Sequence, residues 1–194
     1  MSSLIFYPPF EILYKETNMK PIPTPAKEEY APYYDGYIQF AIKRGDVTTS
    51  LPLQLDEMKT ALGALSDSQA RFRPGPAEWS IKEVVTHLID TERVFAYRLF
   101  CISRKDKTPL PGFEQDDYVR ESGSDEIPLA DLLAEFEHLR RANILAIQNT
   151  KEGNFAEMGT ASGNPVSARA LVYMLVGHVE HHMASLKEKY LPSV

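Results

Sequence analysis

The chain has 194 residues, of which 43% are hydrophobic and 25% are charged. This composition is ordinary for a globular protein, and the length is sufficient for one domain with a sizeable core. The net charge of −6 argues against a general nucleic-acid binder, because such proteins present a basic face to phosphate, although it does not exclude one local basic site.

Membrane and secreted proteins are also disfavoured. No apolar run approaches the roughly 18 residues that a membrane helix needs. The N-terminal stretch lacks a basic region and is interrupted by Pro8, Pro9 and Glu11, so it is a poor signal peptide. The single cysteine, Cys101, excludes an intrachain disulfide and is better explained as a small buried residue than as a nucleophile. We therefore expect a soluble, cytoplasmic protein.

Residues 1–29 are rich in proline and show no clean period, so we expect an irregular N-terminal extension. Met19 is an alternative start, in which case residues 1–18 are an upstream artefact. We expect residues 30–194 to form a single domain. The aromatic residues of its first segment, residues 30–45, favour a strap packed on the domain over a lid or a dimer contact; they are Tyr30, Tyr33, Tyr34, Tyr37 and Phe40.

Two stretches with helical periodicity follow. Between Leu51 and Leu65 the apolar residues recur at steps of four and three, which predicts one amphipathic helix. A second helix is predicted to begin at Ser80, because Ser80 and Glu83 have the spacing of a capping box. Its apolar positions continue to Ile102.

A third helix is predicted over residues 129–147, and residues 104–128 before it form a long loop punctuated by proline and glycine. A fourth helix is predicted to run to about Lys187. Asn164 has the character of its N-cap and Pro165 that of its first helical residue. No stretch shows the alternation expected of a strand.

Four amphipathic helices of about 15–25 residues favour an all-α protein with a four-helix bundle. The second helix would span roughly 35 Å, whereas the 104–128 loop could stretch to about 80 Å. The loop can therefore cross the length of the bundle. We expect helices two and three to be parallel, which gives an up-down-down-up topology with a long crossover between them.

Three of the five histidines lie close together in the run Gly177–His182. His178 and His182 are four residues apart, so on a helix their side chains share one face, about 5–6 Å apart at Cβ. His178 and His181 could also pair, but the apolar stripe that begins at Leu171 favours His182. Two inward imidazoles at this spacing can share one metal ion.

His87 is the best candidate for a third ligand, because it shares the inward face of its helix with Val84 and Leu88. When each histidine is considered alone, the alternative to a metal ligand is a histidine that is hydrogen-bonded in the core. A catalytic zinc site takes three protein ligands and keeps one position open. The chain has neither a His-Glu-x-x-His motif nor the paired Glu-x-x-His motifs of di-iron bundles.

These motifs carry a resemblance to a known family. The segment Trp79–Leu88, with the order Trp-Ser-x-x-Glu-x-x-x-His, and the segment Gly-His-x-x-His-His at 177–182 together resemble the DinB-like superfamily. The loop Gly112–Tyr118 is similar to the same group. The resemblance covers most of residues 45–190 and does not extend to residues 1–29.

The resemblance implies a four-helix bundle that holds one divalent metal ion, zinc or nickel, through three histidines. These map to His87, His178 and His182. It also implies a homodimer and a small-molecule substrate. Relatives include S-transferases that use low-molecular-weight thiols and a thiol-dependent maleylpyruvate isomerase.

The leading functional hypothesis is an enzyme that activates a low-molecular-weight thiol or water at the metal, as a thiol-dependent S-transferase does. A metal-bound thiol is deprotonated, and a metal-bound water can have a pKa near 7. Glu180 or Asp90 could accept a hydrogen bond from an imidazole N–H, although spacing does not establish either, and a solvated Asp90 is the simpler reading.

Three alternatives remain open from the sequence. The first is a metal-dependent hydrolase. The second is a non-catalytic, stress-related protein that binds a metal or another ligand, which fits the absence of an evident acid–base residue beyond the histidines. The third is an interaction module that uses the tyrosine-rich residues 30–40.

Overall fold

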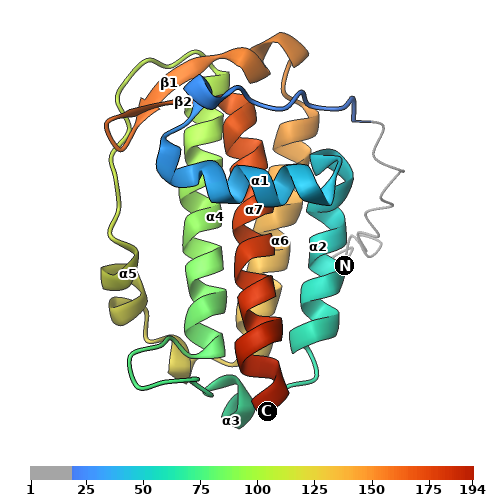
Figure 1. The fold of residues 1–194 in the computed structure, drawn as a ribbon, viewed down its shortest axis with the longest axis vertical. Helices are drawn as coiled ribbons and strands as arrows, with labels where there is room; N and C mark the ends of the chain where they lie inside the picture. The colour runs from blue at the N-terminus through green and yellow to red at the C-terminus, as the bar shows by residue number, and fades with distance from the viewer. Residues whose placement is uncertain (1–18) are drawn as a thin grey trace, which may run out of the picture.

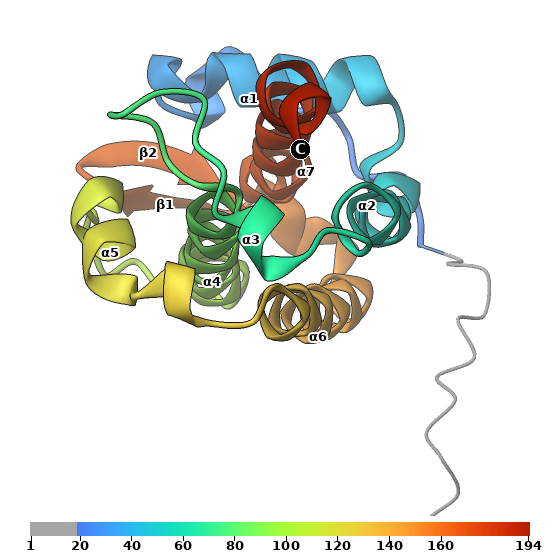
Figure 2. The same ribbon diagram turned by 90° about the horizontal axis from the view of Figure 1, so that it is seen from below.

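The structure, a computed structural model, describes residues 19–194, so the expectations for residues 1–18 lie outside the described residues. Four long helices run along the long axis of the molecule (Figure 1), and from below they form the four corners of a bundle (Figure 2). They are α2 (Val47–Leu62), α4 (Ile81–Ser103), α6 (Leu129–Gln148) and α7 (Ala168–Ser185). The predicted four-helix bundle is confirmed.

The helix starts follow local capping chemistry. At α4 the Ser80 hydroxyl accepts from the Glu83 N–H at 3.1 Å, and the Glu83 carboxylate accepts from the Ser80 N–H at 2.7 Å, which is the predicted capping box. The first predicted helix begins earlier than Leu51, because the Asp46 carboxylate accepts from the Thr48 N–H at 2.8 Å and caps α2 there.

The aromatic segment that the sequence predicted as a strap is largely helical. After short 3₁₀ turns at Lys27–Glu29 and Pro32–Tyr34, helix α1 (Asp35–Arg44) crosses the outer side of α7 (Figure 1). The crossing is close at Gly177, where an added Cβ would lie 1.8 Å from the Tyr37 carbonyl oxygen. Glycine is therefore required at this crossing.

The prediction that the fourth helix starts at Asn164 is wrong, as is the expectation of no strands. Strands β1 (Met158–Ala161) and β2 (Asn164–Ser167) pair in antiparallel register, with Met158 opposite Ser167. Ser162 and Gly163 join them with φ values of 51° and 74°, which is the backbone of a two-residue hairpin turn. The N-cap of α7 is instead Ser167, whose hydroxyl accepts from the Ala170 N–H.

The long segment after α4 runs along the outside of the bundle and contains α5 (Gln115–Ser122) (Figure 1). Asp125, just before α6, accepts from the Ser80 hydroxyl at 2.7 Å, so α4 and α6 begin at the same end of the bundle. Asn154, after α6, donates to the Ser103 carbonyl at 2.9 Å at the other end. Short elements complete the described chain: α3 (Asp67–Ala70), 3₁₀ turns at Ser124–Glu126, Glu152–Ala156 and Leu191–Ser193, and a π turn at Leu186–Tyr190.

The mainly apolar bundle interior contains two buried polar clusters, one of which is the Arg140 network. We use this name for Arg140 of α6, Glu92 of α4, Gln54 of α2 and Asn143 of α6. Arg140 donates twice to the Glu92 carboxylate, at 2.8 and 2.7 Å, and once each to the Gln54 side chain and the Leu175 carbonyl. Asn143 donates to the same carboxylate at 2.9 Å.

Among residues 19–194, no helix is both long enough and apolar enough to cross a membrane.

Candidate metal centre

The second buried polar cluster is the histidine cluster, formed by His87, His178 and His182. The Ser80 cap fixes where α4 begins, and this places His87 two turns into the helix with only 2% of its surface exposed. On α7, His178 is 3% exposed and His182 lies one turn further along. The structure thus brings together the three histidines that the sequence selected.

One nitrogen from each of the three imidazoles lies within 4.8 Å of the others. The closest pair is His87 Nε2 and His178 Nε2, at 2.9 Å. In a tetrahedral zinc site with Zn–N bonds of about 2.0–2.1 Å, the nitrogens are separated by about 3.3 Å. Small rotations of the imidazole rings would therefore place all three nitrogens at ligand distance from one ion.

Burial keeps these imidazoles neutral. It lowers the pKa of His87 to about 4, with a smaller contribution from His181, and it lowers the pKa of His182 to about 3, with contributions from His87 and His181. The pKa of His178 also lies well below its usual value, mainly because of burial. Neutral imidazole is the form that binds a metal, so no proton has to be displaced at pH 7.

Two nitrogens of the cluster are buried without a hydrogen-bond partner. They are His87 Nδ1 and His182 Nε2. A buried polar atom without a partner costs roughly 1–3 kcal/mol, and an ion bound by the imidazoles would remove part of this cost. The donor set fits as well, because imidazole suits zinc, nickel, copper and iron. The residues present therefore fit a divalent metal ion.

His181, which the sequence left as an alternative ligand, is exposed and lies outside the cluster. Its ring packs edge-on against Tyr37 and Phe40 of α1, with centroids 5.4 and 5.7 Å away. The choice of His182 over His181 agrees with this geometry.

The two carboxylates suggested as partners for an imidazole N–H are engaged elsewhere. Glu180 accepts from Arg44 at 2.6 Å and from Gln54 at 3.3 Å. Asp90 lies 3.7 Å from Arg93, and burial raises the pKa of its carboxyl group. Neither hydrogen-bonds to the histidine cluster, because Glu180 faces α1 and α2. The sequence left both contacts as possibilities, and neither is present in this structure.

Aromatic rings enclose the histidine cluster. Tyr37 of α1 meets the His178 ring edge-on at 5.2 Å, and Trp79 lies 4.9 Å from the His87 ring. The sequence identified Trp79 and Tyr37 as part of a motif and a strap, but it did not predict these contacts. Together with helix packing, they leave His87 and His178 only 2% and 3% exposed.

A cleft of about 280 Å³ opens on His87 and His178 and is named here the histidine cleft. It is also lined by Thr91 and Phe95 of α4, by Glu114 just before α5, and by Asp116 in the first turn of α5. Thr91 is 2% exposed and its hydroxyl has no partner. Sequence reasoning missed Thr91, although its position one turn after His87 was a usable signal.

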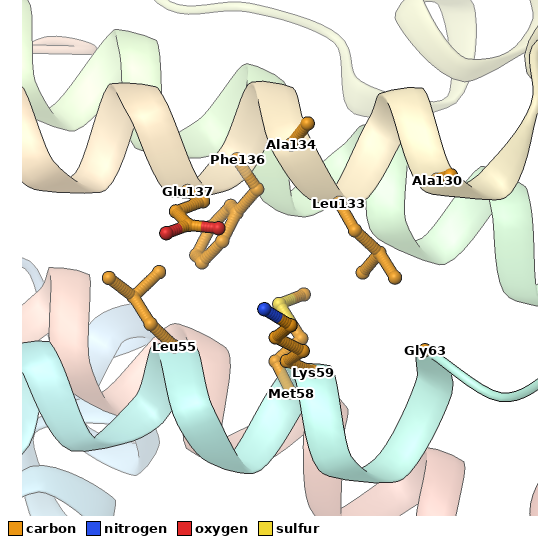
Figure 3. Close-up of a pocket in the computed structure, with 9 residues that line it drawn as sticks. All are labelled: Leu55, Met58, Lys59, Gly63, Ala130, Leu133, Ala134, Phe136 and Glu137. Carbon is orange, nitrogen blue, oxygen red and sulfur yellow. The ribbon is translucent and has the colours of Figure 1, made fainter. Parts of the chain in front are cut away.

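Other features of the described chain are less suited to chemistry. Cys101 is 5% exposed and lies in the core, as the sequence suggested. A cavity of about 270 Å³ between α2 and α6 is lined mainly by apolar side chains such as Leu55, Met58 and Leu133 (Figure 3). It contains no histidine, and its polar groups are Lys59 and Glu137.

Comparison with known proteins agrees with this architecture. The family model described as the DinB superfamily matches residues 51–186. The chain is similar to a solved structure described as "YfiT from Bacillus subtilis is a probable metal-dependent hydrolase with an unusual four-helix bundle topology". The two are 19% identical, the match covers 86% of this chain and 91% of the other, and the TM-score is 0.65, which supports a shared fold. No curated protein sequence matches.

Proposed function

The chain belongs to the DinB superfamily, and from this premise we propose that it is a metal-dependent hydrolase whose ion is held by His87, His178 and His182. The observation that carries the proposal is the convergence of three neutral, buried imidazoles on one point beside an open cleft. Three protein ligands leave a coordination position free for water or substrate, as catalytic zinc sites do.

A bound divalent ion would supply Lewis acidity and lower the pKa of a water molecule from 15.7 to about 7. The protein's own contribution is to hold the three imidazoles in one orientation through Tyr37, Trp79 and helix packing. The free position would face the histidine cleft, because His87 and His178 both line it.

Three further groups of the cleft are suited to roles in hydrolysis. The unpartnered Thr91 hydroxyl can donate to, or accept from, a substrate or a water molecule next to His87. Glu114 and Asp116 are the carboxylates that line the cleft, and either can accept a proton from the attacking water. These groups supply the acid–base chemistry that the sequence alone did not reveal.

The same site supports a second candidate, activation of a low-molecular-weight thiol for S-transfer. The supporting observation is the cleft of about 280 Å³ beside the imidazoles of His87 and His178, which can admit a small thiol. Zinc and nickel are our proposed ions, since imidazole is a good ligand for both. We favour hydrolysis over S-transfer because the similar solved structure is described as a probable metal-dependent hydrolase.

The first experiment measures metal content of the untagged protein by elemental analysis. We expect about one equivalent of a divalent metal in the wild type and a loss of at least 90% in His182→Ala, because two imidazoles without the third hold an ion much more weakly. His181→Ala and His138→Ala are the matched controls, since His181 lies outside the cluster and His138 is exposed on α6. Both should retain the metal.

Activity of the metal-loaded protein then separates the two candidates. Turnover of nitrophenyl esters without a thiol supports the hydrolase, whereas turnover of an electrophile only with added thiol supports S-transfer. Absence of metal in the wild type after reconstitution would contradict both and would favour a non-catalytic bundle.

Further proposals concern the organisation of the protein. We propose an up-down-down-up bundle, which the contacts of Asp125 and Asn154 at opposite ends of α4 support. We also propose that residues 30–194 act as one domain, that the protein is a cytoplasmic homodimer, and that its ligand is a small molecule rather than nucleic acid. Light scattering of the purified protein tests the dimer.

A further inference from the structure

A second pocket lies further along α4, at Arg98. This arginine is only 2% exposed. Its Nη2 donates to the Pro111 carbonyl at 2.7 Å and to the Ser162 hydroxyl at 2.9 Å. These bonds tie the segment before α5 and the turn of the β-hairpin to α4. Both acceptors are neutral oxygens, so they do not balance the charge of the guanidinium.

No carboxylate of residues 19–194 forms an ion pair with Arg98. Other arginines nearby are paired: the buried Arg140 with Glu92, and the exposed Arg93, just over one turn before Arg98, with Glu135 and Asp90. A buried cation without a counter-charge is costly, which is why buried arginines normally have a carboxylate partner. Arg98 is thus an exception in a chain whose net charge is −6.

The remaining donors of Arg98 are reachable. Since both hydrogen bonds of the Arg98 side chain use Nη2, the three N–H groups on Nε and Nη1 have no partner in the described part of the chain. Neither nitrogen is among the fully enclosed side-chain atoms without a partner. They are therefore not completely enclosed, although Arg98 is only 2% exposed, and they can meet a ligand in a cavity that Arg98 lines.

Arg98 lines a cavity of about 210 Å³, named here the Arg98 pocket. Its other walls come from α4, from the segment Leu110–Phe113 and from α5, and they are mainly apolar or aromatic: Val94, Tyr97, Leu110, Pro111, Phe113 and Tyr118. Phe113 also lines the histidine cleft, so the two cavities adjoin beneath the same segment. Figure 1 shows this segment running alongside α4.

We propose that the Arg98 pocket binds the carboxylate of a small organic acid, with Arg98 as its counter-ion and the aromatic walls packed on its apolar part. Arginine is well suited to this role because its planar guanidinium matches a carboxylate. The apolar walls favour an organic acid over a bare inorganic anion.

The Arg98 pocket also restricts the length and charge of a substrate that binds in the histidine cleft. This extension rests on the proposed hydrolase function. His87 and Arg98 are eleven residues apart on α4, which corresponds to about 16 Å along the helix axis. A substrate that reaches both is an extended acid, with its carboxylate at Arg98 and its scissile ester or amide bond near the histidines. An extended peptide of about five residues has this length.

The test measures binding of 4-phenylbutyrate to the metal-free full chain by calorimetry, so that it does not depend on the metal site. The central variants are Val94→Glu and Val94→Gln, which differ only in charge. Val94 lies one turn before Arg98, so the carboxylate of a glutamate there can pair with Arg98 and compete with a ligand's carboxylate, without removing the Nη2 bonds.

We expect wild type and Val94→Gln to bind with affinities within about threefold of each other, and Val94→Glu to bind at least about tenfold more weakly. Equal affinities of the two variants, or no saturable binding by the wild type up to about 10 mM, would overturn the proposal. Stronger binding of phenyl phosphate than of 4-phenylbutyrate would overturn the assignment to a carboxylate.

The experiments distinguish an error in the proposed carboxylate binding at Arg98 from an error in the proposed hydrolase function. If the metal-free wild type does not bind 4-phenylbutyrate, the proposed carboxylate binding at Arg98 is wrong, whatever the result of the esterase assay. If esters are hydrolysed, Val94→Glu should raise KM about tenfold for an extended ester that carries a terminal carboxylate and leave an uncharged ester unchanged. An equal change for both esters would contradict the extension to the substrate.

Discussion

The histidine cluster and the Arg140 network are two polar clusters buried in the same bundle, and both contain residues of α4. They differ in how far their hydrogen-bonding groups are satisfied. The Glu92 carboxylate accepts three hydrogen bonds, and Arg140 donates to Glu92, Gln54 and the Leu175 carbonyl. The histidine cluster retains two buried nitrogens without a partner.

This difference separates a cluster that stabilises the fold from one that awaits a ligand. A satisfied polar network fixes how its helices pack, and removal of one member leaves a buried charge without a partner. An unsatisfied cluster lowers stability until a ligand completes it. The Arg140 network therefore links α2, α4, α6 and α7, and the histidine cluster is the place where function is expected.

The largest effect is expected for Glu92→Gln, which leaves the Arg140 guanidinium buried without its counter-charge. Breaking a buried pair in this way costs about 3–5 kcal/mol. The free energy of unfolding from urea denaturation measures the loss. The double variant Glu92→Leu with Arg140→Leu is the control, and it should recover a large part of the lost stability. A double variant as unstable as the single one would show that the charge is not the cause.

A smaller effect is expected on acidification of the metal-free protein. The pKa of His87 is about 4 in the folded state and near 6.5 in the unfolded chain, so between these values the unfolded chain binds more protons. Stability is therefore full above pH 6.5 and falls as the pH drops toward 4, by roughly 3 kcal/mol for this group. Urea denaturation between pH 7 and pH 4 measures the slope, which should be shallower in His87→Leu. An unchanged slope would contradict burial of a neutral His87.

The smallest effect is expected for Asn143→Ala, at the half-buried margin of the Arg140 network. It removes one hydrogen bond to the Glu92 carboxylate while the two bonds from Arg140 remain. We expect a loss of about 1 kcal/mol, since water can reach this margin and replace the donor. Ala142→Ser, at the exposed neighbouring position, is the control and should change stability by less than about 0.5 kcal/mol. A loss as large as that of Glu92→Gln would place Asn143 at the centre of the network.

The sequence predicted the features that depend on spacing within one helix. The Ser80–Glu83 cap and the pair His178 and His182 are of this kind, because local periodicity determines which face they share. The start of α7 was mispredicted because Asn164 and Pro165 resemble a helix start as well as they fit an edge strand. The tight turn at Ser162 and Gly163 brings Asn164 and Pro165 back alongside β1, so they form strand β2 instead of the start of a helix.

Features that depend on contacts between distant segments were missed. The Arg140 network left a trace in the sequence, since Glu92 continues the apolar stripe of Leu88 and Phe95, and Arg140 lies between Phe136 and Ile144 at helical spacing. Opposite charges within two apolar stripes predict a buried pair. Thr91, Glu114 and Tyr37 surround the histidines only because α1 and the segment before α5 fold back onto α4 and α7.

The close crossing at Gly177 has a consequence for which sequences can share this arrangement. Every side chain other than hydrogen would separate α1 from α7, since even a Cβ would overlap the Tyr37 carbonyl. Separation would lift the Tyr37 ring off His178 and admit solvent to the imidazoles. A chain could therefore keep all three histidines and still lose their enclosure through a single added methyl group, so the glycine that precedes His178 is as diagnostic of this architecture as the histidines themselves.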